Sequence, residues 1–323
     1  MNRRGFIKFI SGAAAAWPLA ARAQQAGRTY TLGFLVPVSR EAAVTVAFFD
    51  ELRVHGFIEG HNLTVLPGGF SVPIARIAET AEAMVKAEPD AIVAGPDPQL
   101  RALQTVTKTI PIVGMTEDMV VSGLVASLSR PGGNITGISL LSPELDSKRQ
   151  EILIEAVPGI RRMATLADTT VTTAQHLQTL RDGAQGRGVE LLVIGVAKPE
   201  DIAPAINEAK TAGAQALNFL ATPIFFNNRR VVFDHVAASR LPAIYQWPEM
   251  AEEGGFASYG ARFTQIFRQR ARIAVKILRG AKPADIPVEQ PSHFELVVNL
   301  RAAQAIGHII PAGLVLRADK VIE

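Results

Sequence analysis

Apolar positions along the chain occur in two alternating patterns. Short continuous runs such as residues 30–36 and 91–94 predict buried strands. Between them, residues 41–55 place Val44, Phe48 and Leu52 on one face, the spacing of a helix. Because strands and helices alternate with few interruptions, we expect parallel sheets covered by helices on both faces.

The alternation comes in two series. In the first, strands are expected at residues 30–36, 62–66, 91–94, 110–113 and 135–140, and helices at 41–55, 74–86, 99–107 and 124–129. The second begins at Ser142-Pro143-Glu144, where Pro suits the first position of a helix. Its strands are expected at 163–167, 190–196, 216–221, 243–245 and 255–259, and its helices at 142–157, 174–187, 199–212 and 227–240.

Two such series in tandem predict an α/β protein with two doubly wound parallel-sheet lobes joined by a hinge. Lobe 1 is expected to comprise residues 29–140 plus about 262–290, since the long helix 263–279 should return to it. Lobe 2 is expected to comprise residues 141–261. Residues 291–323 contain a strand, 294–300, and a short helix, 301–306, whose lobe the pattern leaves open. The hinges are expected near residues 140–142 and 259–262.

The N-terminus has the pattern of an export leader. Arg3-Arg4 and Lys8 form a charged start, residues 9–20 are apolar or small, and Ala21-Arg22-Ala23 has the spacing of a cleavage site. The apolar run is shorter than the roughly 20 residues that cross a membrane. Residues 1–23 are therefore predicted to be a signal peptide cleaved near Ala23, with the protein in the periplasm. The arginine pair favours the twin-arginine route, but a Sec leader can carry the same pair.

Charge and composition limit the classes of partner that the protein is expected to bind. Removing Arg3, Arg4, Lys8 and Arg22 with the leader lowers the formal charge from +3 to −1. No dense basic stripe remains, so nucleic acid is not expected to be a partner. The remaining basic clusters, Arg268/Arg270/Arg272 and Arg229-Arg230, are interpreted as solvated helix faces. The chain has no cysteine, which fits an exported protein that does not depend on disulfides.

The sequence contains no recognisable catalytic apparatus. The phosphate-binding loop, the dinucleotide-binding glycine motif, the nucleophile elbow and the zinc-binding helix motif are all missing. The six histidines are scattered, and glycines separate the closest two, His55 and His61. Asp97, Glu117 and Asp118 could act as acids or bases, but helix capping explains them equally well. We therefore expect no enzyme activity, no cofactor and no metal site.

Candidate ligand contacts follow from the fold. In open α/β sheets, ligands bind beyond the carboxyl ends of the strands. Hydroxyl groups there, with helix N-terminal amides behind them, could hold a carboxylate, and Asp97 and Glu117 suggest a ligand with an ammonium group. Pro37, Val38, Pro223 and Trp247 lie in the same loops. The ligand-binding candidates are Ser39, Gly95, Pro96, Asp97, Glu117, Asp118, Asp168, Thr169, Thr170, Thr222, Tyr245 and Tyr259.

Several segments, together with the leader, resemble one large bacterial family. The matching segments are residues 123–137, 141–145 with Lys148-Arg149, Phe226 with Arg229-Arg230, 241–245, Gly254-Gly255, 258–260, 291–300 and 317–319. The chain thus resembles the ABC-transporter substrate-binding proteins, a family that includes tryptophan and other aromatic amino acid binders. The resemblance implies the type I periplasmic binding protein fold. Loops 95–98 and 116–118 depart from the pattern of many relatives, so the ligand does not follow from it.

The resemblance implies a function and leaves alternatives. It implies a monomeric solute-binding protein that captures a small molecule, such as an amino acid or small carboxylate, and delivers it to an ABC transporter permease in the inner membrane. A ligand-binding sensor of the same fold and an exported α/β enzyme are the alternatives. A sugar-responsive transcription regulator shares the fold, but it needs a DNA-binding head where this chain has its leader.

Overall fold

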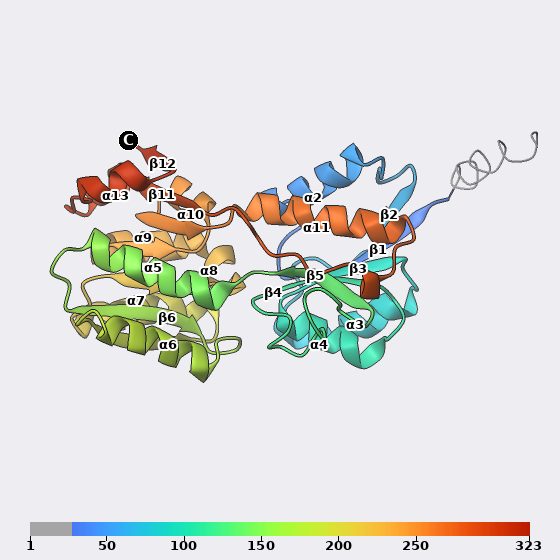
Figure 1. Cartoon of the computed structure of the whole chain (residues 1–323), viewed down its shortest axis with the longest axis horizontal. Helices are drawn as coiled ribbons and strands as arrows, with labels where there is room; N and C mark the ends of the chain where they lie inside the picture. The colour runs from blue at the N-terminus through green and yellow to red at the C-terminus, as the bar shows by residue number, and fades with distance from the viewer. Residues whose placement is uncertain (1–27) are drawn as a thin grey trace, which may run out of the picture.

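The protein consists of two α/β lobes that lie side by side (Figure 1). A computed structural model describes residues 28–323, so the expected leader lies outside the described residues. Each lobe contains one mainly parallel sheet with helices on both faces. The predicted fold class is therefore confirmed.

The first sheet is wholly parallel, with strand order β2-β1-β3-β4-β5. Its strands are β1 Tyr30–Leu35, β2 Leu63–Val65, β3 Ala91–Ala94, β4 Ile112–Thr116 and β5 Ile135–Ser139. Helices α2 Ala43–Val54 and α11 Phe263–Leu278 lie on one face, and α3 Ile77–Lys86 and α4 Asp97–Val106 on the other (Figure 1). Because helices cover both faces, every residue of β3 is buried, which explains its continuous apolar sequence.

Helix α11 joins the first lobe although it follows the last parallel strand of the second. It packs against α2 and contacts β3, β4 and β5. Its buried positions recur at helical spacing and include Ile266, Ile273 and Ile277, so its amphipathic sequence already requires an apolar partner surface. The sheet of the first lobe provides that surface.

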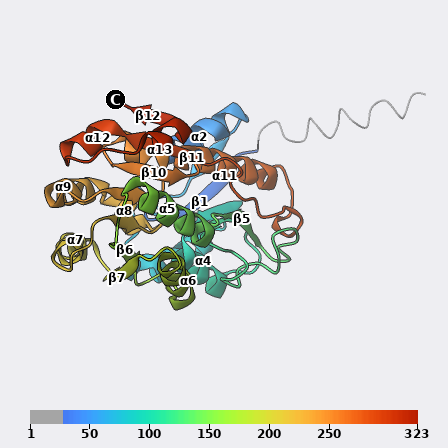
Figure 2. The ribbon, with the colours of Figure 1, turned by 60° about the vertical axis from the view of Figure 1, so that its left-hand side comes forward.

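The second sheet has strand order β12-β11-β10-β9-β8-β6-β7, with only the β10–β11 pair antiparallel. Its strands are β6 Arg162–Asp168, β7 Glu190–Val196, β8 Leu217–Phe219, β9 Ala243–Tyr245, β10 Ala257–Gly260, β11 Glu295–Asn299 and β12 Lys320–Ile322. The long helices are α5 Ser142–Ala156, α6 Ala174–Gln185, α7 Ile202–Thr211 and α9 Arg229–Ser239. Figure 2 shows α5 and α6 on one side of this sheet and α7 and α9 on the other.

Short helices complete both lobes. They are α8 Pro223–Asn227, α10 Pro248–Glu252, α12 Leu300–Ala305 and α13 Ala312–Arg317, with 3-10 turns at Ile74–Arg76, Pro199–Asp201 and Pro283–Asp285. The C-terminal strands β11 and β12 pair with the second sheet. The segment whose lobe the sequence left open thus lies in the second lobe, and the chain passes between the lobes a third time around residues 290–294.

One predicted element is wrong. Residues 124–129 form turns instead of a helix. Leu124 and Val125 are buried in the core of the first lobe, and the Ala126 amide donates to the Pro131 carbonyl at 3.0 Å. The run is too short to gain from helical hydrogen bonds, so burying its two apolar side chains decides its conformation.

Buried polar contacts hold the chain passages between the lobes. Arg149 of α5 donates to the carbonyl of Tyr259 in β10 at 2.9 Å, which ties the helix after the first passage to the strand before the second. Arg262, in the second passage, pairs with Glu252 and with Glu295, the first residue of β11. Gly260 lies against the Gln246 carbonyl, which a Cβ would approach to 2.0 Å, so only glycine fits there.

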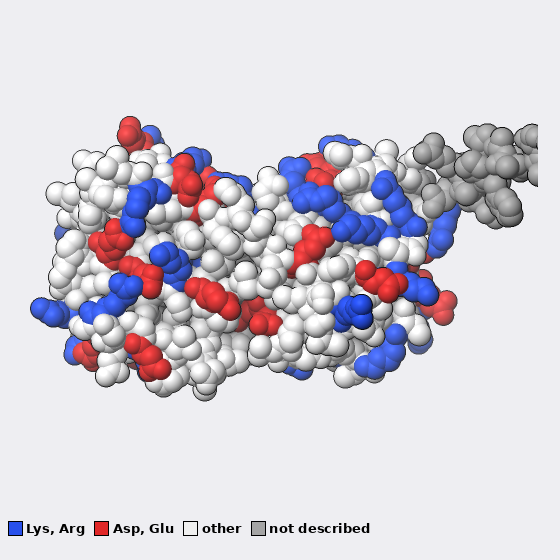
Figure 3. All heavy atoms as spheres, in the orientation of Figure 1, with Lys and Arg blue, Asp and Glu red and all other residues white. Residues whose placement is uncertain are grey.

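Charged side chains of both signs cover the face drawn in Figure 3, and basic ones gather over α2 and α11. Arg268 and Arg272 of α11 lie close to Glu51 of α2, at 3.8 and 3.1 Å. The sequence interpretation of a solvated basic helix face holds for these two residues and is wrong for Arg270, which is fully buried. Arg270 points from α11 into the lobe, toward the ends of the strands.

Candidate functional site

A cavity of about 520 Å³ lies between the carboxyl ends of the two sheets. The first lobe contributes the loops after β1, β3 and β4, and the second lobe contributes those after β6, β8 and β9. Both sheets share the strand order 2-1-3-4-5 over their parallel part, in which the strand order reverses beside the first strand. Ligands of such sheets bind at that point, so the fold itself favours this position.

In the first lobe, two acidic loops reach the cavity. Gly95, Pro96 and Asp97 follow β3, and Glu117 and Asp118 follow β4, and all five line the cavity. The Asp97 carboxylate accepts a hydrogen bond from the Thr116 hydroxyl.

Asp118 supports its own loop. Its carboxylate accepts hydrogen bonds from the amides of Val120 and Val121, at 2.9 and 3.0 Å. No helix follows Asp118 in the structure, so the capping role that the sequence left open is not what it does; it holds the turn at residues 119–123.

In the second lobe, the hydroxyl groups nominated for a ligand carboxylate donate to an acidic side chain instead. Asp168, at the end of β6, is buried and accepts hydrogen bonds from the Thr170 hydroxyl at 2.6 Å and the Thr222 hydroxyl at 2.5 Å. Thr170 and Thr222 line the cavity, whereas Asp168 lies behind them. Because a hydroxyl carries a single proton, neither threonine has a donor left for a ligand carboxylate.

Four other nominated residues, Ser39, Thr169, Tyr245 and Tyr259, do not line the cavity. Tyr245 stacks on Phe219 within the core of the second lobe, with ring centroids 5.2 Å apart, and burial raises the pKa of its hydroxyl. Tyr259 sits in the register of β10 opposite Leu296. Both tyrosines lie within strands, Tyr245 at the end of β9 and Tyr259 in β10, and their rings pack against neighbouring side chains of the lobe.

Aromatic rings form the apolar wall of the cavity. Phe226 of α8, Trp247 after β9, and Phe263 and Phe267 of α11 all line it. The rings of Trp247 and Phe263 stack with centroids 4.2 Å apart and planes 10° apart, and Phe226 and Phe267 meet Phe263 edge to face. The rule that ligands bind beyond strand ends selects the loop of Trp247 but none of the three phenylalanines. The spacing of Phe263 and Phe267, one turn apart at the start of a helix that joins the lobes, is the signal that could have found two of them.

Two buried nitrogen-bearing side chains complete the lining. Arg270 donates through Nη2 to the carbonyl of Ala94, the last residue of β3, and to that of Val113 within β4. Its Nε and Nη1, and the indole Nε1 of Trp247, have no hydrogen-bond partner among residues 28–323. Burial lowers the pKa of the Arg270 guanidinium to about 9.

A buried ion pair lies next to the cavity on the second-lobe side. Asp146 and Arg149 of α5 form a salt bridge, each with only 1% of its side chain exposed. His176 of α6 lines the cavity, and its Nε2 lies 3.2 Å from Asp146. The Arg149 guanidinium and the Asp146 carboxylate are therefore paired in the protein interior, next to the second-lobe side of the cavity.

Among the nominated residues that line the cavity, Glu117 has the largest pKa shift. Its pKa is raised to about 8, first because burial disfavours the charged carboxylate and then because Asp146, Asp97 and Asp168 repel it. Arg149 opposes the shift and does not cancel it. The carboxyl group therefore holds a proton at neutral pH.

Metal binding and membrane insertion find little support in the described residues. Across residues 28–323, no group of three or more His, Asp or Glu side chains could hold a metal ion. Nor does this part of the chain contain a helix with both the length and the apolar character that crossing a membrane requires.

Comparison with known proteins gives a consistent result. The model of the family described as ABC transporter substrate binding protein matches residues 48–322. A tyrosine-binding protein of Clostridioides difficile (strain R20291) is 25% identical over 266 residues, covering 80% of this chain and 75% of that protein.

Two solved structures extend the comparison. A conserved domain protein from Vibrio cholerae is 26% identical, with a TM-score of 0.81, and the match covers 91% of this chain and 99% of that one. An ABC domain from Streptococcus pneumonia in complex with L-Trp also has a TM-score of 0.81, at 23% identity, covering 91% of this chain and all 100% of that chain. At this identity the second structure supports the fold alone.

Proposed function

Because the chain belongs to the family of ABC transporter substrate-binding proteins, we propose that it captures an amino acid with an apolar, aromatic side chain and delivers it to a membrane permease. Members of this family bind substrates and are not enzymes. The observation that carries the proposal is the cavity itself, which combines an aromatic wall with acidic side chains and unpartnered buried donors.

The cavity has the size and lining that such a ligand requires. Small-molecule sites usually have volumes of about 300–1,000 Å³ and apolar walls with a few polar groups. With 520 Å³, this cavity lies within that range. An aromatic side chain would pack against Trp247 and Phe226, which adds a geometry-dependent stabilisation to the burial of its area. The tyrosine-binding relative supports this ligand class.

The ends of the ligand would contact different groups. Of the nominated residues, Gly95, Pro96, Asp97, Glu117, Asp118, Thr170 and Thr222 line the cavity and remain candidates for contact. A ligand carboxylate would approach the unpartnered donors, the Trp247 indole and the Arg270 guanidinium, because both are buried and positively polarised. The acidic loops of the first lobe suit the ammonium group.

The transport cycle would use the chain passages as hinges. Ligand binding between the lobes would favour a closed state, which a permease can distinguish from the open one. The passages near residues 140–142, 260–262 and 290–294 are the places where backbone rotation would let the lobes move. Permease docking, a monomeric state and residence in the periplasm after removal of residues 1–23 belong to this proposal. The leader pattern of Arg3-Arg4 and Ala21-Arg22-Ala23 supports the last of these.

A thermal-shift screen of the chain from Gln24 onward tests the proposal. The library would contain all common amino acids, aromatic acids without an amino group, and small carboxylates. At about 100 times its dissociation constant, a ligand that binds only the folded protein adds roughly 2.7 kcal/mol of stability. We expect aromatic amino acids to give the largest shifts and to be recovered unchanged. The absence of a shift with every amino acid would refute the proposed ligand class.

Replacement of the aromatic wall provides a second test. Trp247→Ala should weaken binding of the best ligand by about tenfold or more, since it removes a ring stack and exposes the ligand to water. Trp247→Phe keeps the ring stack and loses the indole N–H donor. Comparing the affinities of the two variants by titration calorimetry therefore separates the contribution of stacking from that of the donor.

A further inference from the structure

Four carboxyl groups from both lobes converge on one side of the cavity. Asp97 and Glu117 come from the loops of the first lobe, and Asp146 and Asp168 from the second. They are close enough that the other three all raise the pKa of Glu117. Carboxylates this close together destabilise the folded protein by mutual repulsion, unless each one has a positively charged or hydrogen-bonding partner.

Three of the four carboxyl groups have such partners within the protein. Asp146 pairs with Arg149. Asp168 accepts hydrogen bonds from two threonine hydroxyls. Asp97 accepts one from Thr116, and Arg101 lies 3.5 Å away.

Glu117 is the exception. Among the side chains that the structure describes, no hydrogen bond or ion pair reaches its carboxyl group, although its backbone carbonyl accepts from the amides of Leu140 and Leu141, at 3.1 and 3.2 Å. The first passage between the lobes thus holds the backbone of Glu117 in place, while the side chain lines the cavity without a partner.

The surrounding charges determine what can approach this carboxyl group. The groups that face it are Asp97 and Arg101 of α4, Asp118 of its own loop, Asp146 and Arg149 of α5, Asp168 of β6 and His176 of α6. The positive members of this set already have acidic partners in Asp97 and Asp146. Asp118 and Asp168 accept hydrogen bonds from neutral donors, whereas Glu117 has neither a counter-ion nor a hydrogen-bond donor among the described side chains, so a positively charged ligand group would find its partner there.

We propose that Glu117 binds the ammonium group of the ligand and releases a proton to the solvent as it does so. This inference rests on the proposed function and specifies the ammonium site within it. In the empty cavity the carboxyl group is protonated and neutral. The arriving ammonium keeps its own proton and forms an ion pair with the carboxylate, and the carboxyl proton passes to water or buffer.

The linkage between binding and pH follows from the electrostatics. With a pKa of about 8 in the empty site, Glu117 carries about 0.9 proton at pH 7, and this proton is lost when the ion pair forms. The affinity for an amino acid should therefore rise roughly five- to tenfold between pH 6 and pH 7, and it should fall again above about pH 9, where the Arg270 guanidinium loses its proton. A ligand without an ammonium group leaves the proton in place and shows no such rise.

Titration calorimetry with L-tryptophan tests this inference. Binding at pH 7 is measured in two buffers of different ionisation enthalpy, which reports the number of protons released. We expect about 0.9 proton per ligand for the unmodified protein and none for Glu117→Gln. The affinity of Glu117→Gln at pH 8 should fall about tenfold or more, because glutamine keeps the shape and loses the charge. Loss of proton release in this variant assigns the proton to Glu117, since His176 is still present.

Two further titrations complete the design. The analogue 3-(indol-3-yl)propionate lacks the ammonium group and should bind without releasing a proton. Glu151→Gln is the matched control, because Glu151 lies on α5 in exposed ion pairs with Lys148 and Arg187, and it should behave like the unmodified protein.

Two outcomes would overturn the inference, and they differ. If L-tryptophan binds without proton release and Glu117→Gln binds it equally well, the ammonium site lies elsewhere and the proposed function stands. If neither L-tryptophan nor any other amino acid binds the unmodified protein, the proposed function is wrong, and this inference, which depends on it, is wrong as well.

Discussion

Both lobes place acidic side chains at the cavity, but they differ in whether those side chains have a partner within the protein. In the second lobe, Asp146 and Asp168 are buried; Arg149 neutralises Asp146, and two threonine hydroxyls donate to Asp168. In the first lobe, Glu117 is partly exposed to the cavity, and none of the described side chains pairs with its carboxyl group. An acidic residue near a strand end therefore serves the fold in one lobe and remains available to a ligand in the other. Whether such a residue supports the fold or contacts a ligand depends on its hydrogen-bond partners and cannot be read from its residue type.

The largest loss of stability is expected when Asp146 loses its partner. Arg149→Met would leave a buried carboxylate without its counter-ion and would also break the hydrogen bond to the Tyr259 carbonyl. Removing one member of a buried ion pair costs about 3–5 kcal/mol. We expect urea unfolding of the variant to show a loss of this size.

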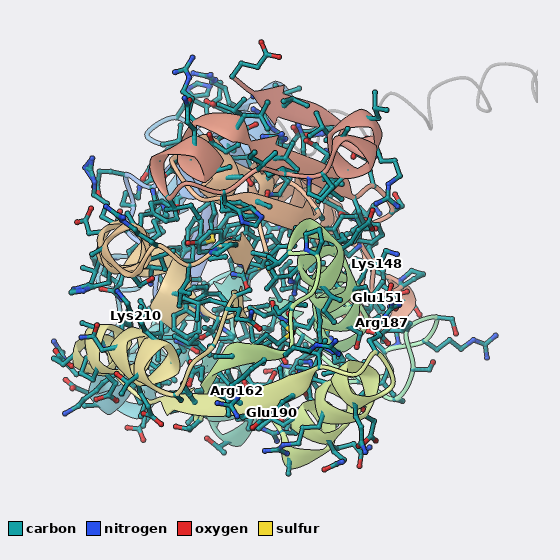
Figure 4. The ribbon with its side chains drawn as sticks, turned by 90° about the vertical axis from the view of Figure 1, so that its left-hand side faces the viewer. Lys148, Glu151, Arg162, Arg187, Glu190 and Lys210 are labelled. Atoms are coloured by element: carbon teal, nitrogen blue, oxygen red, sulfur yellow. The ribbon has the colours of Figure 1, made fainter. Side chains whose placement is uncertain are left out.

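The preceding residue provides the control. Lys148 and Glu151 lie on the outer face of the same helix, near Arg187 (Figure 4), and the Lys148–Glu151 pair is 52% and 42% exposed. Lys148→Met should change the free energy of unfolding by less than about 1 kcal/mol, because exposed ion pairs contribute little. Equal losses in the two variants would contradict the distinction between buried and exposed pairs.

A smaller test concerns Asp168. Thr222→Val removes one of the two hydroxyl groups that donate to this buried carboxylate. Leaving a buried acceptor partly unsatisfied costs about 1–3 kcal/mol, so we expect a loss in that range by urea unfolding. Thr211→Val is the control, since Thr211 is exposed and its hydroxyl only bonds back to the Asn207 carbonyl within α7. A variant of Thr222 as stable as that of Thr211 would show that Asp168 does not depend on this bond.

The smallest expected effect comes from Glu117 itself. Its folded-state pKa of about 8 lies above the value of about 4.3 in an unfolded chain, so the folded state holds the proton more tightly. This contribution to stability is complete below about pH 4 and is lost as the pH rises through 8. Because the side chain is partly solvated, we expect the unmodified protein to lose on the order of 1–2 kcal/mol more than Glu117→Gln between pH 5 and pH 8.5. Parallel stability curves for the two proteins would contradict an unpartnered Glu117.

The regular elements could be predicted because their sequences carry a strong periodic signal. Strands β3, β7 and β9 occupy the predicted residues, and α11 ends within one residue of its predicted end. Elements with too few residues for a periodic signal were missed, namely α8, α10, α13 and β12. The turns at residues 124–129 were misread for the same reason, since two apolar residues in a short run do not distinguish a helix from a buried loop.

The cavity lining was only partly predictable. The rule that ligands bind beyond the strand ends identifies the loops with Asp97, Glu117 and Thr222, which all line the cavity. It does not say which way a side chain turns, and so it also selected Tyr245, whose ring packs on Phe219 inside the second lobe. Phe263 and Phe267 lie on α11, a helix that follows β10 and packs on the first lobe, and no rule about strand ends selects them.

The sequence by itself determined the alternation of strands and helices, the two-lobe α/β fold and the set of loops at the strand ends. These features follow from local periodicity and from the chirality of strand–helix–strand units, which short stretches of chain already contain. Only the tertiary structure decided that Arg270 is buried, that the Thr222 hydroxyl donates to Asp168, and that no described side chain pairs with the carboxyl group of Glu117. Whether a polar group is satisfied depends on residues distant in sequence, such as Thr222 and Asp168, 54 positions apart, which only the folded chain brings together.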